Sequence, residues 1–357
     1  MSYNVLKPEL VWIDGRCYRN TDTFVDISTF QEHDLYENDT IYKDSDENDD
    51  DDNMEVVELD DSRYSTSFHV SKHYLGSIIG RKGYTKSRIE HETKTEIRIP
   101  RQGKDGDITI LGPSATSVKT ARRRINMIVL SSRMKQKPTH FISIPMNKPD
   151  ILNRFIQFKE LVLRECPSRG VEDSIFIQPN KVHLTMGVMC LMDSEERTFA
   201  SKLLTEAKEK VIMPLLQGHL PLKIRVKGLS YMNDDPKDIN VLYANVEEFE
   251  FETSGVLQQL ANEVVAYFSR EGLMKKEDWD PINVKLHVTL LNSKYRNESS
   301  QDLGSSRKRE SFDGSEILRK FGDYEFGVME LSEIHLSQRH ALGPDGYYQP
   351  TFVISVP

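Results

Sequence analysis

The sequence predicts an α+β protein in which a small β-α-α-β-β-α domain precedes a larger α/β domain. Three observations support this prediction. Short strand-like and helix-like segments alternate from residue 63 onward, charge is segregated along the chain, and one six-residue motif occurs twice in the second half. The length of 357 residues also exceeds what one compact core usually holds.

The composition is that of a charged, non-membrane protein. Hydrophobic residues make up 38% of the chain, charged residues 29%, and the mean hydropathy is −0.53. No apolar run approaches the roughly 18 residues that a membrane helix needs, and the first residues lack the pattern of a secretory signal. Because Cys17, Cys166 and Cys190 lie far apart, we expect neither a disulfide scaffold nor a cysteine-rich zinc site. We also expect no metal, no cofactor and no membrane partner.

The net charge of −9 conceals a strongly basic block. Residues 1–62 carry 19 acidic and 4 basic side chains, whereas residues 63–138 carry 17 basic and 5 acidic ones. A basic block inside an acidic chain indicates a polyanionic partner, with nucleic acid the first choice. The alternative is that these lysines and arginines only solvate helix faces.

Two segments precede the basic block. In residues 1–32, Asp14-Gly15 separates two apolar or aromatic runs, which is a hairpin signal. Two short strands are not stable alone, so we expect this segment to dock on a partner or on the body of the protein. Residues 33–62 include DSDENDDDDNMEVVELDD and are expected to be a disordered linker, because they cannot bury enough apolar surface to offset the entropy of ordering. A nucleic-acid mimic that covers the basic block is the less favoured alternative.

Residues 63–137 are expected to form the small domain, with Gly80-Arg81-Lys82-Gly83 joining its first two helices. The glycines let the backbone approach a phosphate chain closely, and the adjacent helix N-terminus and two basic side chains favour an anion. The expected elements are strand Ser65–Val70, helix Leu75–Ile79, helix Tyr84–Thr93, strands Glu96–Pro100 and Asp107–Leu111, and helix Ala115–Leu130.

The segment LGSIIGRKGYTKSRIEHETKTEIRIP resembles the KH family along its length, and the trailing helix corresponds to the type I order. The resemblance implies that Ile79, Gly80–Gly83 and Lys86 bind single-stranded RNA or DNA. A protein-interaction role is the alternative, since some KH domains serve that purpose. Lys86 stands where the family usually has an aliphatic residue, so we expect a groove of different shape and an altered base preference.

Residues 138–357 are expected to form the large domain, which begins at Lys137-Pro138. Asn297–Gly314 is polar and Ser-rich and is expected to be a flexible loop. The expected strands are Thr139–Pro145, Ser174–Met189, Leu222–Val226, Val241–Val246, Asn283–Asn292, Gly327–Gln338 and Gln349–Val356, and the expected helices are Asn153–Glu165, Glu195–Leu216 and Gly255–Arg270.

The duplicated motif reads Lys181-Val-His183-Leu-Thr185-Met and Lys285-Leu-His287-Val-Thr289-Leu. On a strand, alternate side chains share one face, so Lys, His and Thr should point the same way while the apolar residues pack behind them. Two such strands side by side would bring two imidazoles and two hydroxyls together. Looser matches occur at His69 and His335; a structural or surface role is expected for His69, whereas His335 is a weaker candidate for the same cleft.

This constellation suits phosphodiester chemistry without a metal. Imidazole titrates near neutral pH, so one neutral histidine can accept a proton while a protonated one donates a proton to the leaving oxygen. The Thr185 and Thr289 hydroxyls could hold the non-bridging oxygens, and Lys181 and Lys285 could form a phosphate rim. An equally favoured interpretation is that Lys181 and Lys285 are only solvated surface lysines. We expect a bell-shaped pH profile with two limbs near neutrality.

The motif pair and its surroundings resemble the 2H phosphoesterase superfamily (LigT-like) over residues 139–357, most closely the branch with the nuclear-localisation-type domain of A-kinase anchor proteins. The resemblance implies a two-lobed α/β fold with one motif in each lobe and catalytic roles for His183, Thr185, His287 and Thr289. It implies action on 2′,3′-cyclic phosphates, 2′,5′-linked oligonucleotides or RNA 3′ ends, or nucleotide binding without turnover.

The domain order, KH then 2H behind an acidic leader, is similar to a family of subunits of a nuclear transcription-coactivator complex. This resemblance implies nuclear localisation, a helicase subunit among the partners and a link to repair of alkylated nucleic acid. Two hypotheses therefore stay open. The protein is a metal-independent phosphodiesterase guided by a KH domain, or it is a catalytically silent RNA- or nucleotide-binding scaffold subunit.

Overall fold

The computed structural model describes residues 10–13, 16–19, 54–59, 63–100, 106–232, 234–250, 255–274, 283–296 and 309–357. They belong to two compact units, Met1–Glu55 and Val56–Pro357. In the first unit, β1 (Leu10–Ile13) and β2 (Arg16–Arg19) pair antiparallel, as the hairpin signal predicts. The remainder of residues 1–32, and residues 33–53 of the expected linker, lie outside the described residues.

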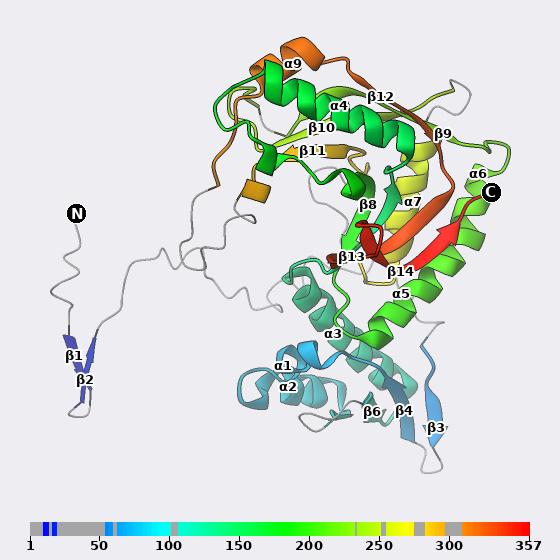
Figure 1. The fold of residues 1–357 in the computed structure, drawn as a ribbon. Helices are drawn as coiled ribbons and strands as arrows, with labels where there is room; N and C mark the ends of the chain where they lie inside the picture. The colour runs from blue at the N-terminus through cyan, green and yellow to red at the C-terminus, as the bar shows by residue number, and fades with distance from the viewer. Residues whose placement is uncertain are drawn as a thin grey trace. The chain divides into compact units, whose positions relative to one another are not determined.

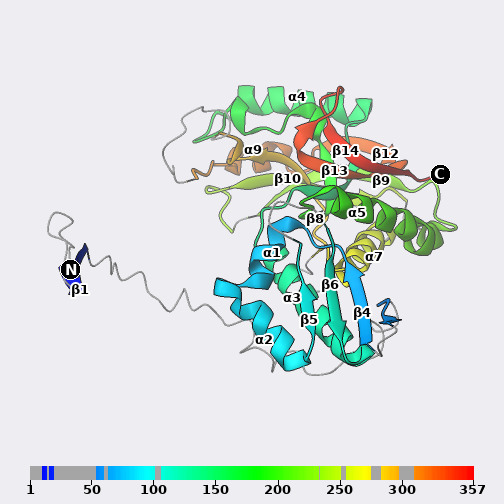
Figure 2. The same ribbon diagram turned by 90° about the horizontal axis from the view of Figure 1, so that it is seen from below.

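The small domain of the second unit has the predicted β-α-α-β-β-α order from β4 to α3, preceded by one additional strand, β3 (Figure 1). Figure 2 shows its three helices beside its antiparallel sheet, whose order is β3-β4-β6-β5 in the described residues. Its elements are β3 (Val57–Leu59), β4 (Arg63–Phe68), α1 (Lys72–Ile79), a 3-10 turn (Arg81–Gly83), α2 (Tyr84–Thr93), β5 (Glu96–Arg98), β6 (Ile108–Gly112) and α3 (Ala115–Met134).

Strand β3 differs from the prediction, because residues 57–59 fall in the segment expected to be disordered. Val57 pairs with Ser65 and Leu59 with Arg63, while the β3 side chains remain exposed. The free edge of β4 offers unpaired backbone groups to any extended segment beside it. Backbone pairing, rather than burial of apolar side chains, therefore accounts for this strand.

The large domain is built on one antiparallel sheet with the order β12-β9-β10-β11-β8-β7-β13-β14 in the described residues. Each of its two halves has four strands, and the central pair β11–β8 is joined only at Val288 and Leu184 among the described positions. The strands are β7 (His140–Pro145), β8 (His183–Met189), β9 (Lys223–Tyr231), β10 (Val241–Glu248), β11 (Val288–Asn292), β12 (Glu325–Glu330), β13 (Glu333–Leu342) and β14 (Tyr348–Ser355).

Helices cover this sheet on several sides (Figures 1 and 2). Helix α4 (Pro149–Glu165) packs against β12, α9 (Ser315–Phe321) against β9, and α5 (Ser194–Ala207) against β14. Helix α7 (Val256–Arg270) packs against β8 and β10. A single apolar cluster runs through both halves of the sheet, so the two lobes share one core.

Several large-domain elements are shorter than predicted, and proline explains two of the differences. The helix expected at Glu195–Leu216 divides into α5, a π-helical turn (Lys208–Ile212) and α6 (Met213–Leu216), because Pro214 cannot donate a backbone hydrogen bond to the preceding turn. The strand expected from Ser174 begins only at His183, because Pro179 opens a 3-10 turn (Pro179–Lys181).

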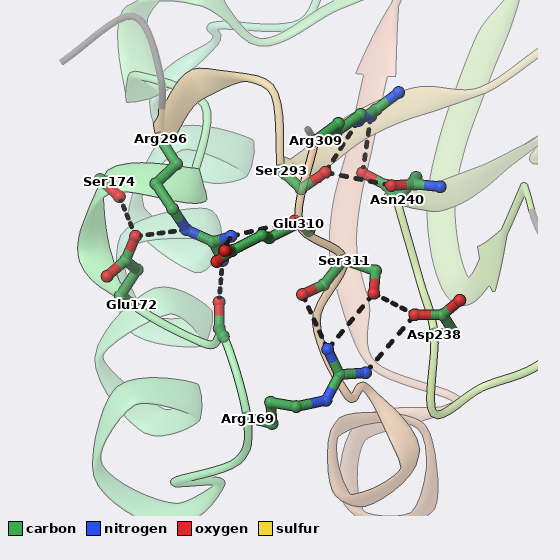
Figure 3. A network of polar contacts seen from close by, with 11 residues as sticks. Arg169, Glu172, Ser174, Asp238, Asn240, Ser293, Arg296, Arg309, Glu310 and Ser311 are labelled. Atoms are coloured by element: carbon green, nitrogen blue, oxygen red, sulfur yellow. Dashed lines mark hydrogen bonds and ion pairs between the residues drawn. The ribbon is translucent and has the colours of Figure 1, made fainter. Parts of the chain in front are cut away.

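Two arginines flank residues 297–308, which lie outside the described residues (Figure 3). Arg296 donates to Glu172 Oε1 over 2.7 Å and to the Gly170 carbonyl over 2.7 Å. Arg309 donates to Ser293 Oγ over 2.8 Å and to Asn292 Oδ1 over 2.8 Å. These bonds hold Arg296 against residues 170–172 and Arg309 against the C-terminal end of β11.

The small and large domains meet at a buried ion pair. Arg133, at the end of α3, donates to Glu196 Oε1 in the first turn of α5 and to the Gly272 carbonyl over 2.7 Å. Arg133 is 9% and Glu196 6% exposed. A second contact joins His69 Nε2 to Asp193 Oδ2 over 3.0 Å, which places His69 at this junction. The two domains are therefore joined by charged groups that largely satisfy one another.

Candidate active site and nucleic-acid clamp

The two copies of the duplicated motif meet at the centre of the large sheet. His183 opens β8, and His287 immediately precedes β11. The antiparallel pairing of Leu184 with Val288 places His183 opposite Thr289 and Thr185 opposite His287. Leu184 and Val288 are fully buried, so the four motif side chains lie together on the other face of the two strands.

Backbone carbonyls hold both imidazoles in the same way. His183 Nδ1 lies 2.6 Å from the Lys181 carbonyl oxygen, and His287 Nδ1 lies 2.7 Å from the Lys285 carbonyl oxygen. A carbonyl oxygen only accepts, so each ring carries its hydrogen on Nδ1 and donates it there. In the neutral ring, Nε2 is then the unprotonated nitrogen, which is the form that a general base requires.

The two lysines are not placed as the strand pattern predicts. Lys181 ends a 3-10 turn and Lys285 precedes the first residue of β11, so neither continues the strand face of its histidine. Their ammonium groups instead lie over aromatic rings. Lys181 Nζ is 5.8 Å from the Tyr348 ring centroid, and Lys285 Nζ is 5.2 Å from that of Tyr243. Each lysine also supplies its backbone carbonyl to its histidine, while the phosphate rim expected of the two ammonium groups stays a prediction.

Tyr243 and Tyr348 are site residues that the sequence pattern did not predict. The Tyr348 ring lies 5.3 Å from the His183 ring, and the Tyr243 ring lies 5.3 Å from the His287 ring. Tyr243 also pairs with Thr289 in the sheet register. Each half of the site therefore has a histidine, a threonine, a lysine and a tyrosine wall, so the internal duplication extends beyond the six-residue motif.

The aromatic surroundings of the two histidines differ, because two rings flank His183 whereas the Tyr243 ring lies against His287. His183 lies between Phe141, whose ring centroid is 5.0 Å away, and Tyr348. Burial, together with the neighbouring His287, lowers the pKa of His183 to about 4, although the hydrogen bond to Lys181 acts in the opposite direction. His183 is consequently neutral at pH 7.

His335, the weaker candidate, is not brought into the pair. It lies on β13 opposite Ser143 of β7, which in turn pairs with Thr185 of β8. Two strand spacings, roughly 10 Å, thus separate it from Thr185. Its Nε2 lies 3.1 Å from a Glu333 carboxylate oxygen, and its ring lies against buried Tyr347.

The Gly80–Gly83 turn of the small domain has the backbone that a phosphate clamp requires. Gly80, Lys82 and Gly83 all have positive φ, at 69°, 53° and 81°. A Cβ at Gly80 would lie 2.1 Å from Thr85 Oγ1, so only glycine fits there. Arg81 and Lys82 are exposed, and α2 begins directly after Gly83. The turn thus has a left-handed backbone and two exposed cations, whereas its binding of a phosphate chain stays a prediction.

An ion pair lies on α2 close to this turn. Lys86 Nζ donates to Glu90 Oε1 over 2.8 Å, and the same oxygen accepts the Ile97 amide of β5 over 2.7 Å. Ile79 remains 38% exposed at the end of α1. Glu90 was not predicted, although its i,i+4 spacing from Lys86 is the available signal.

Neither a metal cluster nor a membrane span occurs in the described residues. They contain no group of three or more His, Cys, Asp or Glu that could hold a metal ion. No helix in the described part of the chain is long and apolar enough to cross a membrane.

Solved structures resemble the chain only weakly. Escherichia coli LigT in its apo form overlaps with 62% of this chain and 99% of its own, with a TM-score of 0.34 and 16% identity. Protein TT0787 of Thermus thermophilus overlaps with 61% of this chain and 97% of its own, with a TM-score of 0.35 and 17% identity.

Sequence comparisons are more specific. The KH domain family matches residues 65–127, and the AKAP7 2′5′ RNA ligase-like domain family matches residues 138–356. These matches confirm the predicted fold class. Activating signal cointegrator 1 complex subunit 1 of Mus musculus is 37% identical over 358 residues, which cover 97% of both chains. The chain, a KH domain followed by an AKAP7 2′5′ RNA ligase-like domain, therefore belongs to the family of activating signal cointegrator 1 complex subunit 1.

Proposed function

We propose that the large domain is a metal-independent phosphodiesterase that acts on RNA or nucleotide phosphodiesters, and that the KH domain supplies the single strand. The observation that carries the proposal is the convergence of His183 and His287, each held through Nδ1 by a backbone carbonyl. Two imidazoles with matched tautomers and unequal surroundings are what paired general acid–base catalysis requires.

The low pKa of His183 supports assigning it the role of general base and His287 the role of general acid. His183 is neutral at pH 7, so its Nε2 accepts the proton of the attacking water as the new P–O bond forms. In this proposal His287 is the general acid, which donates an Nε2 proton to the leaving oxygen as the other P–O bond breaks. The hydroxyls of Thr185 and Thr289 donate to the non-bridging oxygens, where negative charge accumulates. Tyr243 and Tyr348 provide aromatic faces for the flanking nucleotides.

We further propose that the chain works in the nucleus as a subunit of a helicase-containing coactivator and alkylation-repair complex, with residues 1–32 as the docking segment. Support comes from the relative, which is named as a subunit of the activating signal cointegrator 1 complex. Deleting residues 1–32 should abolish complex formation while RNA affinity stays unchanged. Loss of RNA binding instead would contradict the docking role.

The enzymatic proposal is tested by turnover of end-labelled oligonucleotides in EDTA. The panel is linear RNA, linear DNA, 2′,3′-cyclic-phosphate RNA and 2′,5′-linked RNA. Cleavage or opening of one of them in EDTA supports the proposal and identifies the substrate class. An absolute requirement for Mg²⁺ would contradict the mechanism. If nothing turns over, but the wild type binds an oligonucleotide that His183→Ala and His287→Ala release, the protein is instead a binding scaffold.

The KH clamp is tested by reversing its charge. Arg81→Asp/Lys82→Asp should weaken binding of single-stranded RNA by more than about tenfold at low salt, because repulsion replaces the attraction of two phosphates. The slope of log K against log salt should also become shallower, by about 0.7 for each phosphate that the protein no longer neutralises. Fluorescence anisotropy at several salt concentrations measures both quantities.

The matched control is Lys202→Asp/Lys210→Asp, which reverses the same charge at exposed positions of the large domain. Equal weakening by both double variants would show that net charge, rather than the clamp, governs binding.

A further inference from the structure

We propose that Tyr84 is a stacking platform for a nucleobase, and that it extends the single-strand site beyond the Gly80–Gly83 clamp onto a second face of α2. This inference rests on the proposed role of the KH domain as a single-strand clamp. The ligand class is an unpaired base of RNA or DNA that is continuous with the clamped strand.

The exposure of Tyr84 is the first observation. Tyr84 is the first residue of α2, directly after Gly83, and is 67% exposed. Among the large apolar side chains of the described residues, it exposes the greatest fraction of its surface. An aromatic ring at the mouth of a phosphate clamp is the arrangement with which single-strand-binding proteins hold bases without regard to sequence.

The second observation is an open pocket of about 630 Å³ beside this ring. Arg81, Lys82, Tyr84, Thr85 and Ser87 line it. The volume lies within the range of roughly 300–1,000 Å³ that small-molecule sites span. One wall is aromatic, and the others carry two cations and two hydroxyls. A nucleotide has complementary parts, a flat base and an anionic phosphate with polar sugar oxygens.

The ring is also supported from within the helix. The Arg88 guanidinium, one turn further along α2, lies 5.9 Å from the Tyr84 ring centroid. A cation near an aromatic ring at i,i+4 spacing favours one ring orientation. Holding an exposed side chain in place before binding reduces the entropy lost when a base stacks on it.

The platform is separate from the groove that the KH resemblance implies. Lys86 and Glu90 face β5, where Glu90 accepts the Ile97 amide. Tyr84 and Lys86 lie about 200° apart around the helix, so Tyr84 points to another side of α2. Arg81 and Lys82 belong to the turn that precedes α2, and both line the pocket beside Tyr84. A nucleic-acid strand held at the Gly80–Gly83 turn could thus place some bases in the groove on the Lys86 side of α2. The adjoining base of the same strand would then stack on Tyr84.

The test compares short and extended oligonucleotides on the full-length protein. Uridine tetramers are extended by one to three nucleotides at the 5′ or the 3′ end, with 2-aminopurine at the added positions. For wild type, extension at one end should tighten binding and quench 2-aminopurine. Tyr84→Ala should bind the tetramer as wild type does and lose about fivefold or more of the affinity for the extended strand. Tyr84→Phe should retain both properties.

Tyr267→Ala is the matched control, because Tyr267 also has an arginine beside its ring, Arg270 at 5.3 Å, on a helix of the large domain. It should behave as wild type. The platform is overturned if wild type and Tyr84→Ala bind the extended strand with equal affinity. It is also overturned if Tyr84→Ala loses as much affinity for the tetramer as for the extended strand. If Arg81→Asp/Lys82→Asp still weakens binding by more than about tenfold in either case, the clamp stands without the platform. A wild type that binds no single strand of any length contradicts both claims.

Discussion

His183→Ala and His287→Ala are each expected to lower kcat/KM for the reactive oligonucleotide by about 10²- to 10⁴-fold, the usual contribution of a positioned acid or base. Each variant removes one of the two proton transfers, and neither transfer replaces the other. The double variant should therefore be little worse than the singles, because residues that act as a unit are not additive. Initial rates with end-labelled substrate measure all three.

His340→Ala is the control for these variants, because His340 is an exposed histidine of the same domain and sheet. It should keep wild-type activity. If kcat/KM of either motif variant falls by less than about tenfold while substrate binding is unchanged, that histidine does not act in the chemical step.

Arg133→Met is expected to lower the free energy of unfolding by about 3 to 5 kcal/mol. The variant leaves the Glu196 carboxylate buried without its cation, although it still accepts the Met192 amide over 2.7 Å. Arg133→Met/Glu196→Met should recover part of this loss, because removing both charges of a buried pair costs much less than removing one. Urea denaturation followed by circular dichroism measures these differences.

Arg319→Met is the matched comparison. Arg319 pairs with Glu316 at the surface, where both side chains are largely exposed, so its removal should lower the free energy of unfolding far less than removal of Arg133. If Arg133→Met costs as little as Arg319→Met, the junction between the two domains is not held by the buried pair.

The small domain was predictable because its signals are local. A glycine pair three residues apart, apolar residues at helical spacing and short alternating strands determine the order of its elements. Strand β3 was missed because Val57–Leu59 lies in a strongly acidic stretch, and only a free sheet edge in the fold gives it a partner. Lys86 was predicted as a groove residue from its place in the KH-like segment. Its ion pair with Glu90 could not be predicted in the same way, because it depends on the conformations of the two side chains.

The active-site prediction depended on repetition rather than on local structure. His183, Thr185, His287 and Thr289 stand out because the same six-residue pattern occurs twice. Tyr243 and Tyr348 lie in no repeated motif. Tyr243 reaches the site because the register of β10 places it beside Thr289, and Tyr348 because the first residue of β14 lies against His183. The turns before the strands also could not be predicted from a period of two, so the carbonyls of Lys181 and Lys285 were missed as partners of the histidines. The phosphate-rim role of their side chains stays a prediction.

The acid–base asymmetry changes the expected pH dependence. A base works only when unprotonated, so activity should fall as pH decreases through the pKa of His183, which is about 4 rather than near neutrality. A bound phosphate anion stabilises the imidazolium, so the acid limb of kcat should lie above that of kcat/KM. In the unfolded chain His183 binds a proton near pH 6.5, whereas in the folded protein it does so only near pH 4. The free energy of unfolding should therefore decrease as pH falls from about 6.5 to 4. Circular dichroism at each pH separates unfolding from loss of chemistry.

The most direct test of the central claim is the pH profile of kcat/KM for the reactive oligonucleotide in EDTA, between about pH 3.5 and 9. Two histidines acting as base and acid predict a bell, with an acid limb near the pKa of about 4 of His183 and an alkaline limb where the general acid is no longer protonated. A flat profile, or one with a single limb across this range while the protein stays folded, would contradict the two-histidine mechanism.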